Sequence, residues 1–260
     1  MSSGSHVEPA SLPGAAGDAT LPVSASAPIP VLEGYERWAP TYDQAPNPLL
    51  AREERYLTPL LVGVSNKRVL DLACGTGRWL ARLLTHGAEC GVGVDYSAAM
   101  LKTAGSKSVL TGRVARADCE NLPFRVCVFD LAICSFVLGH IQDLLSLARE
   151  LASVMRPGSD VFVSDLHPEA YARGWRTGFR DGRTACQIET IPRTTDEIVR
   201  AFCGTGFEYL SEVSLRLGEP EKPIFVQAGK SESFAEACQV PAVLVGHFRR
   251  LSLPTESRGA

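Results

Sequence analysis

The residues best suited to ligand chemistry stand in one short stretch, Asp71-x-Ala73-x-Gly75-x-Gly77. Val69, Leu70 and Leu72 form a short apolar run, and apolar residues at helical spacing follow the glycines, which predicts a strand, a tight turn and a helix. Glycines let the backbone approach a ligand closely, and the free amide groups at a helix N-terminus suit a nucleotide-like molecule. A carboxylate at the strand end would repel a phosphate and favour a cationic amine.

The spacing of this turn argues against a dinucleotide ligand. A pyrophosphate site has the pattern Gly-x-Gly-x-x-Gly, in which the last glycine lets the helix pack against the strand. Leu80 stands where that glycine belongs. The turn therefore predicts a nucleotide-like ligand other than NAD.

Two further acids follow predicted strands in the same way. Asp95 ends the apolar run at 89–95, and Asp118 follows a third strand that begins at Val114. One carboxylate can accept hydrogen bonds from both hydroxyls of a ribose diol, so Asp95 suits an adenosine ligand, including NAD. Because the carboxyl ends of parallel strands meet at one edge of a sheet, these acids predict a binding site at that edge.

The stretch from Asp71 to Gly77 resembles the first motif of class I S-adenosylmethionine (SAM) dependent methyltransferases, written acidic-x-Gly-x-Gly-x-Gly. The departure is Ala73 for the first glycine, a residue for which positive φ is restricted. The later order of strand, Leu-x-His-Ile, helix, Arg-Pro-Gly and strand is also similar to this family. The resemblance covers about residues 33–230 and points to small-molecule enzymes similar to the ubiquinone and menaquinone methyltransferase group.

This resemblance implies a site for SAM as the cofactor, and the scattered cysteines predict no metal site. Asp118 would accept from the adenine amino group, and the amide of Cys119 would face a ring nitrogen. The aromatic segment 35–43 would form a lid in which Tyr35 and Tyr42 offer hydroxyls to the SAM carboxylate. The predicted cofactor-binding residues are Tyr35, Tyr42, Asp71, Ala73, Gly75, Gly77, Asp95, Tyr96, Asp118, Cys119 and Ser135.

His140 and His167 are the candidates for a general base or a substrate contact. Both follow predicted strands whose carboxyl ends face the site. A base helps where the acceptor carries a proton that must leave, as in a phenol or an enolisable ring carbon. Each histidine can instead be a structural residue at a helix start. Methyl transfer does not oblige the protein to supply a base, because good positioning is worth about 7–11 kcal/mol.

Strands alternate with helices along the chain, which predicts an α/β fold with a doubly wound, mostly parallel sheet. The resemblance implies seven strands, the last of them antiparallel. Ser97 and Thr194 or Thr195 are expected to cap helices. The later elements are expected to be a strand at 126–134, a helix at 143–155, strands at 161–167, 207–217 and 223–229, and a terminal helix within 231–252.

The composition predicts one large domain with unstructured ends. A chain of 260 residues that is 45% hydrophobic can form a substantial core. Residues 1–30 are rich in Ser, Ala, Gly and Pro and are expected to be disordered, and 253–260 to be frayed. Residues 31–252 would form the methyltransferase domain, with an N-terminal lid and helix at 31–63 and a substrate-side insertion at 168–192.

Charge and cysteine content bear on the partners. A formal net charge of -3 gives no general attraction to nucleic acid or anionic lipid. The apolar runs are too short to span a membrane, and the N-terminus lacks the features of a secretory signal. The eight cysteines form no Cys-x-x-Cys pair, which favours reduced core thiols in a cytoplasmic protein. The expected partners are a small-molecule methyl acceptor and, at most, a second copy of the chain.

The leading prediction is methyl transfer from SAM to oxygen, carbon or nitrogen of a phenolic, quinone-like or natural-product acceptor. Three alternatives stay open. Methylation of tRNA or protein lacks an added domain or a basic stripe to support it. A SAM-binding protein without turnover would carry the same donor motif. An NAD-linked oxidoreductase rests on the strand-turn-helix and Asp95 alone.

Overall fold

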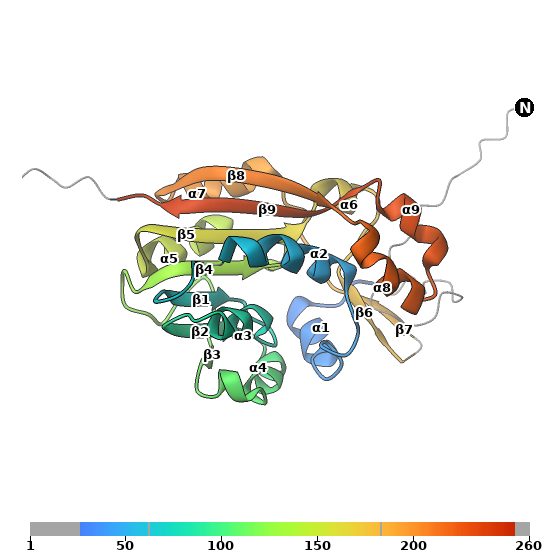
Figure 1. Ribbon diagram of the computed structural model, residues 1–260, viewed down its shortest axis with the longest axis horizontal. Coiled ribbons are helices and arrows are strands. Elements are labelled where there is room, and N and C mark those ends of the chain that lie inside the picture. The colour runs from blue at the N-terminus through green and yellow to red at the C-terminus, as the bar shows by residue number, and fades with distance from the viewer. Residues whose placement is uncertain (1–26, 62, 183, 253–260) are drawn as a thin grey trace, which may run out of the picture.

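A seven-stranded sheet forms the centre of the structure, a computed structural model that describes residues 27–61, 63–182 and 184–252 (Figure 1). From one edge to the other the strands are β3 Val114–Arg116, β2 Cys90–Asp95, β1 Arg68–Leu72, β4 Phe129–Ser135, β5 Met155–Leu166, β9 Pro241–Arg250 and β8 Phe207–Arg216. The first five are parallel, and β9 runs antiparallel to both β5 and β8. The predicted α/β class, strand number and antiparallel last strand are confirmed.

Helices cover both faces of this sheet. They are α1 Val31–Trp38, α2 Pro48–Leu57, α3 Arg78–Thr85, α4 Ala98–Gly105, α5 Leu144–Val154, α6 Pro168–Ala172, α7 Thr195–Cys203, α8 Lys222–Gln227 and α9 Phe234–Ala237. Short 3-10 helices lie at Thr58–Leu61, Ser108–Leu110, Leu138–His140, Glu219–Glu221 and Ser231–Ser233. None of the helices in the described ranges is long and apolar enough to cross a bilayer.

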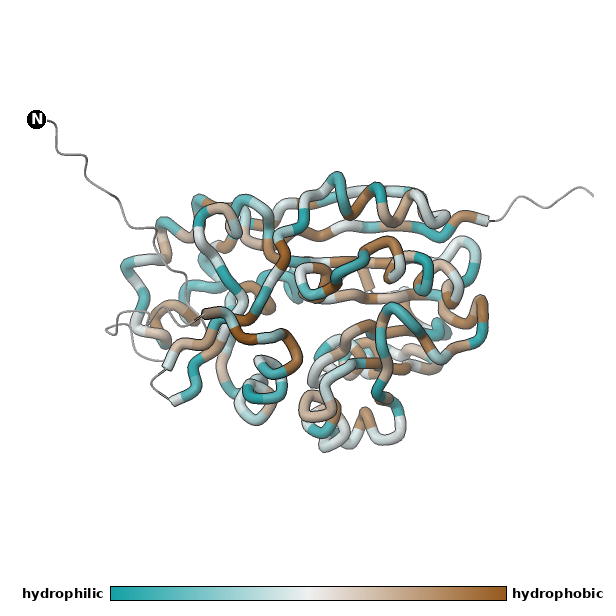
Figure 2. Tube along the Cα trace, turned by 180° about the vertical axis from the view of Figure 1, so that it is seen from behind, coloured by the Kyte–Doolittle hydropathy of each residue, from teal (hydrophilic) through white to brown (hydrophobic). Residues whose placement is uncertain are grey.

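The core lies in two layers because successive strand residues point to opposite faces. Leu70 of β1 and Ala132 of β4 belong to the layer beneath α5 and α7. Val69 and Leu131 belong to the layer beneath α2 and α3. Seen from behind, apolar and polar positions alternate along the helices that cover the sheet, as an amphipathic helix requires (Figure 2). The central strands are therefore buried on both sides, which fixes their carboxyl ends as a rigid edge.

Helix caps fall where the sequence predicts them. The Ser97 side chain accepts a hydrogen bond from the amide of Met100 at the start of α4. Thr194 and Glu197 form a reciprocal capping box at the start of α7. Both caps follow strands or loops at the edge of the sheet that carries the predicted ligand residues.

Several predicted element boundaries are wrong. Strand β4 begins three residues later than expected, and β5 begins at Met155, where a helix end was expected. Residues 222–227 form helix α8 rather than a strand, consistent with Pro223 in its first turn. Residues 241–250 form strand β9 rather than a terminal helix. Its apolar residues are buried between β5 and β8, where the strand makes ladder bonds on both sides.

The segment predicted as a substrate-side insertion contains a hairpin that supports α1. Its strands are β6 Gly178–Asp181 and β7 Thr184–Gln187. The Phe179 ring stacks on Trp38 of α1 with centroids 5.3 Å apart, and Ile188 packs in the same small core. Ile29 already pairs with Ile188, so 27–30 belong to the fold rather than to a tail. The predictions for residues 1–26 and 253–260 lie outside the described residues.

Candidate functional site

A cavity of about 310 Å³ lies at the carboxyl ends of β1, β2, β3 and β4, where an open parallel sheet binds its ligands. Eleven predicted site residues line it. They are Tyr35, Tyr42, Asp71, Ala73, Gly75, Asp95, Tyr96, Asp118, Cys119, Ser135 and His140. Gly77 and His167 are not among the lining residues. The strand-end acids therefore meet in one place, as their spacing predicts.

The turn after β1 has a left-handed backbone at three alternate positions. The φ angles are 53° at Ala73, 54° at Gly75 and 76° at Gly77. A Cβ atom on Gly77 would lie 2.3 Å from Cδ1 of Leu110, so this glycine allows the start of α3 to pack closely. Gly77 shapes the turn from behind the cavity. Ala73 adopts the positive φ that alanine disfavours, as its place in the motif suggested.

Asp71 is a buried carboxyl at the base of the cavity, with 2% of its surface exposed. Its Oδ2 accepts a hydrogen bond of 2.8 Å from the amide of Leu80. Among the described residues no hydrogen bond reaches Oδ1. Burial raises the pKa of Asp71 to about 7, although the Leu80 amide opposes the shift. Leu80, the residue that departs from the dinucleotide pattern, thus anchors the acid of this site.

The other two acids are held by backbone amides. Asp95 accepts from the amides of Gly75 and Ser97, each at 2.8 Å, and burial raises its pKa. Asp118 accepts from the amide of Glu120 at 2.9 Å. Each carboxylate oxygen can accept more than one hydrogen bond, so these contacts orient both acids and leave acceptor capacity towards the cavity.

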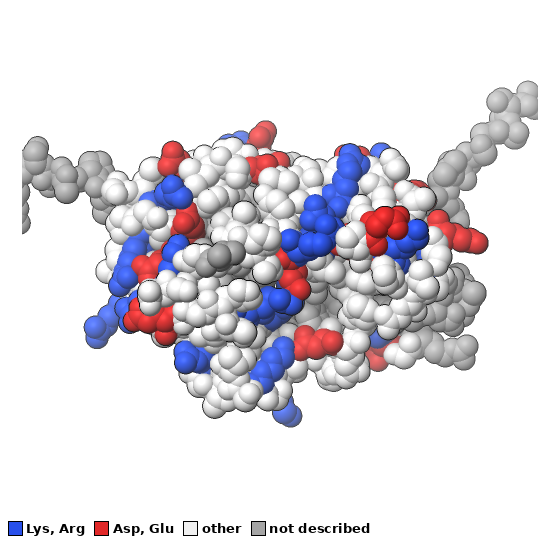
Figure 3. All heavy atoms as spheres, viewed as in Figure 1, with Lys and Arg blue, Asp and Glu red and all other residues white. Residues whose placement is uncertain are grey.

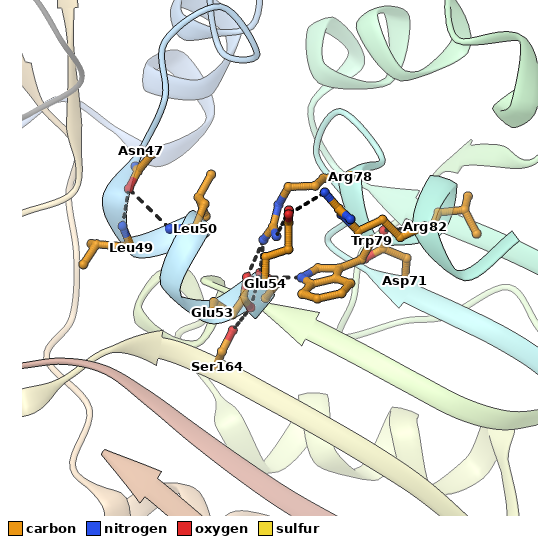
Figure 4. Close-up of polar contacts among 12 residues, drawn as sticks. Asn47, Leu49, Leu50, Glu53, Glu54, Asp71, Arg78, Trp79, Arg82 and Ser164 are labelled. Atoms are coloured by element: carbon orange, nitrogen blue, oxygen red, sulfur yellow. Dashed lines mark hydrogen bonds and ion pairs between the residues drawn. The ribbon is translucent and has the colours of Figure 1, made fainter. Parts of the chain in front are cut away.

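A buried network under the cavity was not predicted (Figure 4). Glu53 of α2 has no exposed surface and accepts from the guanidinium of Arg78 and the indole of Trp79. Its other oxygen accepts from the hydroxyls of Ser135 and Ser164, at the ends of β4 and β5. One carboxylate therefore joins α2, α3 and two strands. The Ser135 hydroxyl donates to Glu53 at 2.8 Å, and because Ser135 also lines the cavity, its contact with the cofactor stays a prediction.

Tyr35 and His140 form a hydrogen-bonded pair on the other side of the cavity. The Tyr35 hydroxyl lies 3.0 Å from Nε2 of His140, and Nδ1 lies 3.1 Å from the backbone oxygen of Glu189. A carbonyl oxygen can only accept, so Nδ1 carries the proton. Burial lowers the pKa of His140 to about 4, so the ring is neutral and Nε2 accepts from Tyr35. Tyr35 consequently has no proton to offer a SAM carboxylate, contrary to the prediction.

The Tyr42 hydroxyl can still donate a hydrogen bond to a SAM carboxylate. Within the described part of the chain its hydroxyl makes no hydrogen bond, and burial raises its pKa to about 12, which keeps the proton on the oxygen. Tyr96 lies at the rim, half exposed, with the Arg116 guanidinium 5.1 Å from its ring centroid. Burial also raises the pKa of the Cys119 thiol to about 12, so the thiol is neutral and lines the cavity as a small apolar side chain.

His167 lies away from the cavity and has a structural role. Its Nδ1 accepts a hydrogen bond from the amide of Glu169 and caps α6. Its Nε2 lies 3.0 Å from the Ser214 hydroxyl on β8. The prediction of a base at this position is therefore replaced by the alternative of a helix-start histidine.

The segment after α1 is fastened to the turn after β1. Asp43 accepts from the Thr76 hydroxyl at 2.7 Å and pairs with the Lys107 ammonium at 2.8 Å. Lys107 also donates to the backbone oxygen of Thr76 at 2.7 Å. We call Asp43, Thr76 and Lys107 the latch. The latch holds α1 and its aromatic side chains over the cavity.

Comparison with known proteins places these features in a family. The family described as Methyltransferase domain (Methyltransf_25) matches residues 69–158. The demethylmenaquinone methyltransferase of Mycobacterium tuberculosis is 30% identical over 192 residues, which cover 71% of this chain and 76% of that protein. The demethylmenaquinone methyltransferase of Lactiplantibacillus plantarum is 34% identical over 138 residues, 48% of this chain and 57% of that protein. The match to the biotin biosynthesis bifunctional protein BioHC of Cellvibrio japonicus, at 31% identity, covers 53% of this chain and 27% of that protein. The chain thus spans less than two thirds of several of its relatives.

Solved structures share the fold at lower identity. A SAM-dependent methyltransferase from Mesorhizobium loti has a TM-score of 0.62 and 24% identity, covering 78% of this chain and all of that one. The [4+2]-cyclase SpnF has a TM-score of 0.60 and 17% identity, covering 87% of this chain and all of that one. These likenesses show the fold alone, and the second shows that this fold also carries other reactions.

Proposed function

The chain belongs to the class I SAM-dependent methyltransferases, and on that basis we propose that it transfers the methyl group of SAM to a small-molecule acceptor. The observation that carries the proposal is the meeting of Asp71, Asp95 and Asp118 with the turn after β1 in one cavity. A cation, a ribose diol and an adenine amino group are the three parts of SAM that carboxylates recognise. A dinucleotide would place a pyrophosphate against the buried Asp71.

The residues of the cavity fit SAM part by part. Asp71 would receive the ammonium group through Oδ1, and Tyr42 would donate its hydroxyl to the carboxylate. Asp95 would accept from the ribose hydroxyls. Asp118 and the amide of Cys119 would hold the adenine. Bound SAM supplies an electrophilic methyl group on a sulfonium, so the chain has chiefly to align the acceptor and exclude water.

The acceptor would occupy the side of the cavity formed by α1, the start of α2 and the end of β4. The sheet order places β4 on the opposite side of β1 from β2 and β3. The adenosine part of SAM and the acceptor would therefore lie on either side of β1. Oxygen, carbon and nitrogen acceptors all suit this arrangement, because the reaction needs collinear alignment more than a particular base.

Titration calorimetry with SAM and S-adenosylhomocysteine tests the cofactor, and a methyl-transfer assay over a panel of small acceptors tests the reaction. We expect micromolar binding of both ligands and transfer to at least one acceptor. The variant Asp95→Asn should weaken binding, and Glu208→Gln, an exposed acid on β8, should not. Absence of binding to either ligand would refute the proposal. Binding without transfer would favour a SAM-binding protein without turnover.

A nucleic-acid acceptor is the less favoured candidate. The net charge is -3, and acidic and basic side chains lie next to one another on the face drawn in Figure 3. Such a surface lacks the single-sign field that steers a polyanion. The acceptor panel should therefore include tRNA, and methylation of tRNA at low salt would reverse this preference.

A cytoplasmic location is also part of the proposal. All eight cysteines lie in the described part of the chain and none is in a disulfide, with Cys127 and Cys203 exposed. Exposed free thiols are typical of a reducing compartment. Fractionation of cells tests the location, and light scattering tests the predicted homodimer.

A further inference from the structure

The acceptor side of the cavity is lined mainly by apolar side chains. Its walls are Val31, Leu32, Leu50, Phe136, Val137 and Ile141. The one cation that lines the cavity within the described residues, Arg78, is already paired with Glu53. Tyr35 and His140 are the polar groups that face this side from α1 and from the turn after β4. A charged acceptor would lose its hydration here without gaining an ionic partner.

The direction of the hydrogen bonds in the Tyr35–His140 pair decides whether the Tyr35 hydroxyl can donate to a ligand or accept from it. The Glu189 carbonyl takes the Nδ1 proton, so Nε2 of His140 accepts. The single proton of Tyr35 goes to Nε2, at 3.0 Å. In the Tyr35–His140 pair, the lone pairs of the Tyr35 oxygen are then the groups still available for a hydrogen bond with a ligand. This oxygen can accept a hydrogen bond from a ligand and cannot donate one.

Both members of the pair are braced by the chain that forms and follows the hairpin β6–β7. A Cβ atom on Gly34 would lie 2.7 Å from Ile188, so α1 rests directly on this side chain. Glu189, the next residue, holds the His140 ring. The amide of Ile191 bonds to the Gly139 oxygen at 2.7 Å. Residues 188–191, which follow the hairpin, therefore orient the Tyr35 and His140 side chains without lining the cavity.

We propose that this side of the cavity selects an uncharged, largely apolar acceptor that carries a hydroxyl or N–H group, which donates a hydrogen bond to the Tyr35 oxygen. The inference rests on the proposed function, because it assigns the acceptor of the same site. An ether or a carbonyl at the same position would face the lone pairs of Tyr35 and leave them unpaired. The site therefore distinguishes a hydroxyarene from its methyl ether and from a ketone of similar size.

The pair also gives the departing proton a route when the hydroxyl oxygen is methylated. The acceptor O–H bond breaks as the oxygen takes the methyl group and the sulfonium becomes a thioether. The proton passes to the Tyr35 oxygen while the proton of Tyr35 passes to Nε2 of His140. His140 ends the step as an imidazolium, and loss of that proton to solvent restores the pair.

Equilibrium binding of three naphthalenes of similar size tests the selection. The probes are 2-naphthol, 2-methoxynaphthalene and 2-acetonaphthone, titrated into the full chain saturated with S-adenosylhomocysteine, which prevents turnover. We expect 2-naphthol to bind about tenfold more tightly than either of the others, the upper range of one hydrogen bond. Equal affinities, or tighter binding of the ketone, would overturn the inference.

Two variants separate hydrogen-bond direction from simple packing. In His140→Phe the Tyr35 proton is released, so the preference should shift towards 2-acetonaphthone. In Tyr35→Phe the difference among the three probes should fall to about twofold or less. Tyr209→Phe, an exposed tyrosine on β8, should keep the wild-type preference. An unchanged naphthol preference in both site variants would also overturn the inference.

The outcome is separable from that of the proposed function. If S-adenosylhomocysteine does not bind the wild-type chain, the proposed function fails first. If it binds and the three probes are not distinguished, the acceptor inference alone fails. Retained S-adenosylhomocysteine affinity in the two site variants shows that they are folded.

Discussion

Ionisation of Asp71 should make SAM binding depend on pH near neutrality. Burial is the main reason that its pKa is raised to about 7, and Asp95 and Glu53 add to the shift while Arg78 and the Leu80 amide oppose it. The ammonium group of SAM favours the ionised carboxylate of Asp71. The fraction of the protein in which Asp71 is ionised therefore sets the apparent affinity for SAM. That fraction is about 9% at pH 6.0 and about 50% at pH 7.0 for a pKa of about 7. The affinity should therefore rise roughly fivefold over this unit of pH.

In the ligand-free protein the raised pKa of Asp71 affects folding stability, and this effect has the opposite dependence on pH. The unfolded carboxyl of Asp71 ionises near 3.8 and the folded one near 7. The folded state consequently holds the proton more tightly. Its contribution to stability is present below about 3.8 and is lost as the pH rises towards 7. The ligand reverses this trend, because binding of a cation favours release of the same proton.

Calorimetry with S-adenosylhomocysteine at pH 6.0, 6.5 and 7.0, in buffers of different ionisation enthalpy, measures both the affinity and the protons released. The range stops at 7 because an α-amino group begins to lose its proton near about 7.7–8.0. Asp71→Asn should bind about tenfold more weakly or worse and show no slope. Asp165→Asn, whose buried carboxyl has a pKa of about 6 but does not line the cavity, should keep the slope. A flat wild-type profile, or the same slope in Asp71→Asn, would refute the assignment.

Three further substitutions test the turn, the latch and the buried network. Ala73→Gly should raise the free energy of unfolding by about 0.5–1 kcal/mol in chemical denaturation, because φ is 53° there. Asp43→Asn removes the charge that pairs with Lys107, so S-adenosylhomocysteine should dissociate roughly two- to fivefold faster in stopped-flow measurements. Glu53→Ala leaves the buried Trp79 indole and Ser164 hydroxyl without their acceptor and should cost about 3–5 kcal/mol of unfolding free energy by the same denaturation assay.

Matched controls make these results specific. Glu54→Ala removes a neighbouring carboxylate whose side chain is 30% exposed and should cost about 1 kcal/mol or less. A comparable loss in both glutamate variants would contradict the central role of Glu53. If Ala73→Gly is less stable than the wild type, the packing contacts of the lost methyl group contribute more to stability than the removal of backbone strain at the positive φ of residue 73. An unchanged dissociation rate in Asp43→Asn would show that the latch does not retain the ligand.

The donor side of the site was predictable because it depends on local chemistry. Parallel strands place the residues after their carboxyl ends at one edge, so Asp71, Asp95 and Asp118 could be brought together from their spacing alone. Ala73 could be identified as the irregular position because the motif requires a left-handed backbone there. These predictions depend on residues within a few positions of a strand end.

The features that the sequence did not predict depend on contacts between segments far apart in the chain. Glu53 lies within a stripe of apolar residues on α2, and a charge on an apolar stripe was the available signal. Its partners, up to 111 positions away, cannot be found from a helical pattern. Residues 241–250 read as a helix because a short apolar run does not distinguish a buried strand from a buried helix. His140 and His167 both follow strands in the sequence, but the sequence does not show that His167 caps α6 while His140 lines the cavity.

The position of β9 sets an order for the assembly of the sheet. Among the strands that the structure describes, β9 comes last in the sequence, yet it lies between β5 and β8 and provides the only strand contacts of β8 within the described sheet (Figure 1). During synthesis β1 to β5 emerge first and can pair in sequence. Strand β8 must wait until residue 250 has left the ribosome. The three acids are therefore assembled early, while a chain that stops before residue 241 would leave the edge of β5 open to pairing with another molecule.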